Sequence, residues 1–129
     1  MFLDDREFLR AFHEGELESL HHKDHLRIAW TVLRSHSIDE AKVLVSQGIK
    51  DFAEAKGARG LYHETLTQFW IRIVHHAIQT SPNDDFESLV QKHPVLLDKT
   101  IPLRHWSRET LASPEAKAAW VAPDILPLP

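Results

Sequence analysis

Three histidines fall close together at the start of an apolar segment, where Leu20 to Trp30 reads LHHKDHLRIAW. In a helix, His22 and His25 lie on the same side as Ala29, which is the apolar side of this segment. Their i, i+3 spacing brings the two imidazoles near one another. The pattern therefore predicts two neighbouring histidines that face the interior of the protein.

A third candidate lies in LYHETLTQFW, at the start of the most apolar segment of the chain. At 100° per residue, His63 is expected on the inner face with Trp70, whereas Glu64 is expected to point outward. If the two helix starts converge, His22, His25 and His63 form a three-imidazole set suited to Zn, Fe, Ni or Cu, with an open fourth position for catalysis. If Glu64 faces inward instead, two histidines and a carboxylate resemble the ligand set of a non-haem Fe(II) centre.

These residues predict a metal-binding protein that could act as a metal-dependent enzyme, with Zn or Fe as the metal. Glu64, Tyr62 or Thr65 would then handle protons or position the substrate. Metal-activated water would permit hydrolysis, and Fe(II) would permit oxygen chemistry. The segment HETLT lacks the second histidine of a zincin, and the chain has neither a phosphate-binding Gly-rich loop nor a Gly-x-Ser-x-Gly elbow.

The alternative hypothesis is a non-catalytic helical module that binds a partner protein or a small ligand. An inward histidine is more often a hydrogen-bonded core residue than a metal ligand. The histidines would then be satisfied internally, or would act as a pH-sensitive cluster. Measured metal content distinguishes the two hypotheses, because only the first one requires a bound ion.

Composition sets the class of protein. A chain of 129 residues fits one domain that buries about two-thirds of its unfolded surface. Fifteen basic residues are scattered among nineteen acidic ones, so we expect no nucleic-acid partner. There is no cysteine to form a disulfide or a thiolate site, and no apolar run approaches the roughly 20 residues that span a bilayer. Because the N-terminus MFLDDREFLR is acidic, unlike a signal peptide, we expect a cytoplasmic protein without a membrane partner; a small-molecule ligand or a homo-oligomer stays open.

A 3.6-residue period dominates the chain and predicts an all-α fold with four to five main helices. Ser37 and Glu40 have the spacing of a capping box, and Ser81 or Asn83 is expected to cap a short fifth helix that stops at Pro94. The first four helices are expected at residues 4–13, 21–35, 37–57 and 61–80.

The C-terminal part is expected to be less regular. Pro102 and Pro114 break it into short helical turns, the last of which is capped by Ser113. Residues 121–129 read VAPDILPLP and are expected to lie extended over the bundle, with their apolar side chains packed on it. The whole chain would then form one helical domain over residues 1–129.

The segments HKDHLRIAW, YHETLTQFW and SRETLASPEAKAAWVAPD together resemble a family of small, uncharacterised bacterial all-helical proteins. These proteins pair a His-x-x-His motif with a later Tyr-His-Glu-Thr motif and end in a serine-rich Pro-Asp tail. The resemblance covers nearly the whole chain, although Trp106 stands where the family pattern has tyrosine. It supports the location of a site without implying an activity. The residues to which it draws attention are His22, His25, Tyr62, His63, Glu64, Thr65, Ser107 and Asp124.

Overall fold

The structure is a computed structural model that describes residues 3–129. The described residues contain helices and connecting segments but no strand, which confirms the all-α prediction. None of these helices combines the length and the apolar character needed to cross a membrane. The elements are α1 (Asp5–His13), α2 (His22–Leu33), α3 (Ile38–Ala55), η1 (Arg59–Leu61), α4 (Glu64–Thr80), α5 (Phe86–Lys92), η2 (Pro94–Leu97), η3 (Ile101–Arg104), α6 (Arg108–Ala112) and α7 (Pro114–Ala118).

Side chains that satisfy free backbone N–H groups start most of these helices. At α3 the predicted capping box is present: the Glu40 N–H donates to Ser37 Oγ at 3.2 Å, and the Ser37 N–H donates to Glu40 Oε1 at 2.9 Å. Ser113 caps α7 with Pro114 in its first turn, also as predicted. Local sequence therefore determines where these helices begin.

Two helix starts differ from the predictions. The fourth helix begins at Glu64 rather than at residue 61, because residues 59–61 form the 3₁₀ turn η1 and His63 caps α4. The fifth helix is capped by Asp85, whose side chain accepts the Ser88 N–H at 2.8 Å, and not by Ser81 or Asn83.

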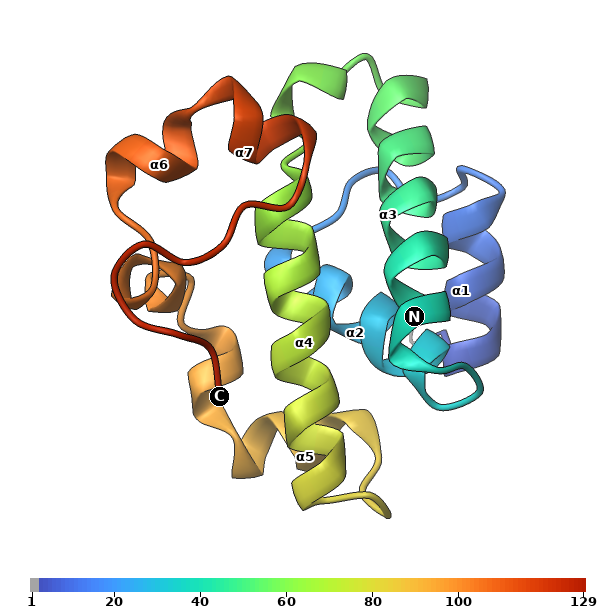
Figure 1. Ribbon diagram of the computed structural model, residues 1–129. Helices are drawn as coiled ribbons and strands as arrows, with labels where there is room; N and C mark the ends of the chain where they lie inside the picture. Colours follow the sequence, from blue (N-terminus) through green and yellow to red (C-terminus); the bar gives the residue numbers. More distant parts are fainter. Residues whose placement is uncertain (1–2) are drawn as a thin grey trace.

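Helix α4 runs through the middle of the molecule, with α1 and α3 on one side of it and α6 and α7 on the other (Figure 1). It packs against α2, α3 and α7. The main core contains buried residues of all five longer helices, including Phe12, Leu26, Val45 and Val74. The side chains on several faces of α4 therefore pack against other parts of the protein.

A second, smaller core lies between α4 and the C-terminal segment. It is built on Phe69, Ile101 and Trp106, all buried, with Val121 and Leu128 packed against them. The Trp106 indole N–H donates to the Val121 carbonyl at 3.1 Å. These contacts attach the non-helical last residues to α4 and to the turns that follow α5.

Candidate functional site

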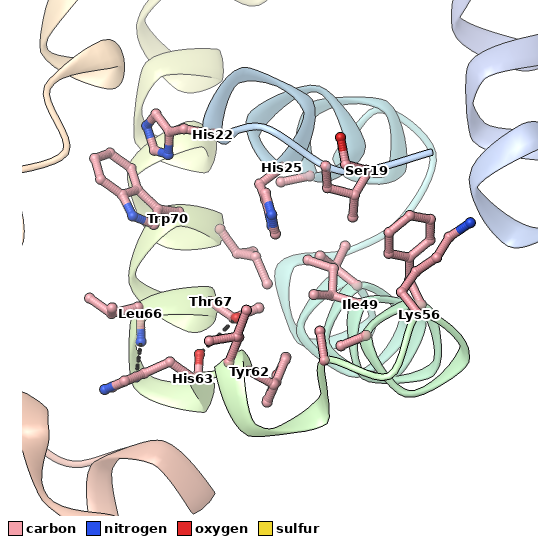
Figure 2. Close-up of a pocket in the computed structure, with 18 of the residues that line it drawn as sticks. Ser19, His22, His25, Ile49, Lys56, Tyr62, His63, Leu66, Thr67 and Trp70 are labelled. Carbon is pink, nitrogen blue, oxygen red and sulfur yellow. Dashed lines mark hydrogen bonds between the residues drawn. The ribbon is translucent and has the colours of Figure 1, made fainter. Parts of the chain in front are cut away.

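A cavity of about 490 Å³ lies between α2, α3 and α4. Residues 18–20 and the segment that leads into α4 complete its wall (Figure 2). Most of the lining is aliphatic or aromatic: Leu20, Ala29, Val45, Ile49, Phe52, Ala53, Ala58, Leu61, Leu66, Trp70 and Ile71. The remaining lining residues carry polar groups, and the three predicted histidines are among them.

His25 offers a free imidazole to this cavity. It extends from α2 towards the middle of the cavity (Figure 2), and neither ring nitrogen has a hydrogen-bond partner in the part of the chain that the structure describes. Burial lowers the pKa of His25 to about 4, with a further contribution from His22, while Asp24 acts in the opposite direction. The ring is therefore neutral at pH 7 and presents one donor and one acceptor.

His22 lines the same cavity, but its ring is already engaged. Nε2 donates to the carbonyl of Leu96 at 2.7 Å, which leaves the proton on that nitrogen. The ring also packs edge-on against Trp70, with 4.5 Å between centroids. Burial, and to a smaller extent Lys99, lowers its pKa against the opposing effect of the Leu96 hydrogen bond. His22 thus fixes the contact between α2 and the segment after α5.

His63 uses both of its ring nitrogens. As the N-cap of α4 it accepts the Leu66 N–H on Nδ1 at 3.1 Å, and Nε2 donates to the carbonyl of Leu111 at 2.7 Å. A metal on either nitrogen would displace one of these bonds. The inward orientation predicted for His63 agrees with its place in the cavity wall, yet its present partners give it a structural role.

The three histidines therefore share one cavity without forming a cluster. Within residues 3–129, no group of three or more histidine, aspartate or glutamate side chains is arranged to hold a metal ion. Two of the three predicted ligands are hydrogen-bonded to backbone carbonyls from other parts of the chain. Metal binding stays a prediction, and loading would require these side chains to rearrange.

Glu64 does not point outward as predicted, because it is only 7% exposed. Its carboxylate lies on the α3 side of α4, where it accepts hydrogen bonds from the Tyr62 hydroxyl at 2.7 Å, Gln68 at 2.6 Å and Ser46 at 3.3 Å, with Lys50 Nζ at 3.5 Å. Burial alone would raise the pKa of Glu64, but these partners outweigh it and lower the pKa. Burial raises the pKa of the Tyr62 hydroxyl. The ring of Tyr62 lines the cavity, whereas its hydroxyl belongs to the Glu64 network.

Thr65 is fully buried on the side of α4 that meets the C-terminal segment. Its hydroxyl donates to the carbonyl of Ala119 at 2.9 Å and accepts the Val121 N–H at 3.2 Å. Asp124 holds the same segment further on, since it accepts from the Ser107 N–H at 2.9 Å and from the Ser107 hydroxyl at 2.8 Å. Thr65, Ser107 and Asp124 thus anchor the last residues, away from the cavity lining.

The sequence reasoning missed other cavity residues. Trp70 was placed on the inner face of its helix, but nothing in the local pattern distinguished it from a core residue. Phe52 and Ile49 belong to the apolar stripe of α3 and give the same signal as residues of a closed core. No sequence pattern marks Lys56 or Lys99 as a cavity residue, because only the tertiary arrangement brings both to the cavity.

Comparisons with models of known protein families, with curated proteins and with solved structures found no match to this chain. The residues of the cavity are consequently the basis for inferring a function.

Proposed function

We propose that the protein binds a small, largely apolar molecule in the cavity between α2, α3 and α4. The observation that carries the proposal is the cavity itself, which has a volume of about 490 Å³ and a mainly apolar lining interspersed with polar side chains such as His25. Small-molecule sites have volumes of about 300–1,000 Å³ and this same composition.

His25 gives the site a means of recognition beyond apolar contact. A polar group that loses water on burial has to gain a hydrogen bond or it costs free energy. The unpartnered ring of His25 gains such a bond when a ligand hydroxyl, carbonyl or similar group lies against it. The ligand therefore combines an apolar body with at least one hydrogen-bonding group.

Binding without catalysis is the simpler form of this proposal. Of the three residues predicted to be catalytic, Glu64 and Thr65 are absent from the cavity lining, and the Tyr62 hydroxyl donates to Glu64. We also propose that residues 1–129 form one compact helical bundle. The lining of the cavity contains no residue of the Pro-rich tail, residues 121–129.

A variant that fills the cavity tests this proposal. Ala53 on α3 lines the cavity, while Ala55, two residues further along the same helix, is exposed and does not line it. With the neutral fluorescent probe N-phenyl-1-naphthylamine, we expect saturable binding to the wild type and to Ala55→Phe, and binding at least tenfold weaker to Ala53→Phe. Circular dichroism checks that both variants keep their helices. A wild type that does not bind the probe, or equal binding by the two variants, contradicts the proposal.

A metal ion in the same cavity is the second candidate function, supported by the presence of His22, His25 and His63 among its lining residues. Elemental mass spectrometry of protein purified without a histidine tag tests it. Near-stoichiometric Zn or Fe that is lost in His25→Ala supports a metal site. A metal-free protein that does not take up either ion on incubation contradicts it.

A further inference from the structure

The rim of the cavity carries positive charge that is not neutralised by the protein. Lys56 and Lys99 both line the cavity, and neither forms an ion pair within the described residues 3–129. Other lysines do have such partners: Lys23 lies 3.0 Å from Glu87, and Lys92 lies 2.9 Å from Asp84. The two lysines at the cavity are thus available to a charged ligand.

The lining holds little negative charge to oppose an anion. Among the lining residues that the structure describes, Glu18 is the single acid, and it is exposed in the segment before α2. The carboxylate nearest in sequence to the cavity wall of α4 is Glu64, which is turned towards α3 and Lys50. The electrostatic balance at the mouth therefore favours an anionic group.

The two lysines are not equivalent. Lys56 Nζ already lies 3.4 Å from the Gly15 carbonyl and 5.4 Å from the centre of the Phe52 ring. Among the residues that the structure describes, Lys99 makes no such contact; it lines the cavity and follows Leu96 by three residues, and the Leu96 carbonyl accepts the His22 Nε2–H at 2.7 Å. Figure 2 shows His22 and Lys56 on opposite sides of the cavity, with His25 between them. The free ammonium group is consequently at the His22 end.

We propose that the occupant of the cavity is an amphipathic monoanion, an apolar chain that ends in a carboxylate. The carboxylate lies at the rim beside Lys99 at the His22 end, where it also accepts a hydrogen bond from the His25 ring, and the chain extends from there towards Ile49 and Phe52. This inference rests on the proposed function, because it specifies the ligand of the same cavity.

The arrangement is physically consistent. A carboxylate that stays at the exposed rim keeps part of its hydration shell, so that it avoids the large cost of burying a charge. The chain removes apolar surface of the cavity from water, which provides most of the affinity. The lysine then selects for a charged head group without requiring a buried ion pair.

Octanoate and 1-octanol form a matched pair of ligands that differ at the head group. Each is tested by its displacement of N-phenyl-1-naphthylamine from the wild type, from Lys99→Gln and from Lys56→Gln. We expect Lys99→Gln to weaken octanoate by about two- to fivefold, the range for an exposed charge pair, and to leave 1-octanol unchanged. Lys56→Gln should weaken octanoate less than Lys99→Gln does, because Lys56 Nζ already lies 3.4 Å from the Gly15 carbonyl. Added salt should weaken octanoate alone.

The outcomes separate the two proposals. If 1-octanol displaces the probe but Lys99→Gln does not lower the affinity for octanoate, the inference of a carboxylate ligand is overturned. The proposed site for an apolar ligand is then still supported. A selective loss of octanoate in Lys56→Gln instead overturns the position of the head group. If neither compound displaces the probe, or the probe itself does not bind, the proposed function fails.

Discussion

Replacing Thr65 by valine tests whether this residue is structural or functional. The substitution keeps the β-branched shape and the side-chain size but removes the hydroxyl, which joins α4 to the Ala119 carbonyl at 2.9 Å and to the Val121 N–H at 3.2 Å. Because Thr65 is fully buried, its hydroxyl has no access to water, and all of its interactions are with the protein.

The expected loss of stability follows from the two backbone groups, the Ala119 carbonyl and the Val121 N–H, that lose their hydrogen-bond partner. A buried backbone group left without a hydrogen bond costs about 1–3 kcal/mol, and less where water can replace the partner. Ala119 is exposed and Val121 is half-buried, so water compensates part of this cost. We therefore expect Thr65→Val to lower the free energy of unfolding by about 1–2 kcal/mol.

Thr67→Val is the matched control. It makes the same change two residues further along α4, where the hydroxyl donates to the carbonyl of His63 in its own helix at 2.8 Å. Such a bond adds little to stability, so the control should stay within about 0.5 kcal/mol of the wild type. Urea unfolding followed by circular dichroism measures both variants. Equal stability of the two variants would refute the anchoring role. Loss of probe binding by folded Thr65→Val would refute its placement outside the site.

Two further predictions concern His25 and the start of α3. The pKa of His25 in the folded protein, about 4, lies below its ordinary value of 6.5. The contribution of the neutral His25 ring to stability is therefore complete above pH 6.5 and is lost as the pH falls towards 4. Urea unfolding measures the free energy of unfolding at pH 7.5 and at pH 4.5. Its decrease between these two pH values should be about 2.5 kcal/mol smaller in His25→Asn than in the wild type. An identical decrease would mean that the ring is solvated. Ser37→Ala removes the acceptor of the Glu40 N–H and should cost about 1 kcal/mol, whereas Ser35→Ala, outside the cap, should cost less than half of that in the same assay.

The start of α5 illustrates the limit of local helix signals. The segment TSPNDDF offers several side chains that can cap a helix, and capping preferences alone rank Ser81, Asn83 and Asp85 almost equally. In the structure Asp85 is the cap, and the following Phe86 is buried against Trp30. Packing of this phenylalanine, which is a tertiary contact, decides among caps that are equivalent locally. By contrast, the starts of α3 and α7 each had one strong candidate and were predicted.

Periodicity identified which histidines face inward but not what they bind. His22, His25 and His63 were all placed on inner faces, and all three line the cavity. Their hydrogen-bond partners are the carbonyls of Leu96 and Leu111, which are 74 and 48 residues away in sequence. Both carbonyls belong to segments interrupted by proline, for which no helical period exists to predict an orientation. The difference between a metal ligand and a hydrogen-bonded wall residue thus depended on these distant segments.

The same consideration explains why Glu64 was expected at the surface. A helical wheel has one inner and one outer face only when the helix packs on a single side. Since α4 meets α2, α3 and α7, residues of α4 outside the cavity lining also face other parts of the protein. Polar residues on such a stripe must find partners inside the protein, as Glu64 does with Tyr62 and Thr65 does with the C-terminal segment. In the first turn of α4 these polar side chains therefore join α4 to α3 and to the C-terminal segment, and His25 on α2 supplies an unpartnered polar group to the cavity.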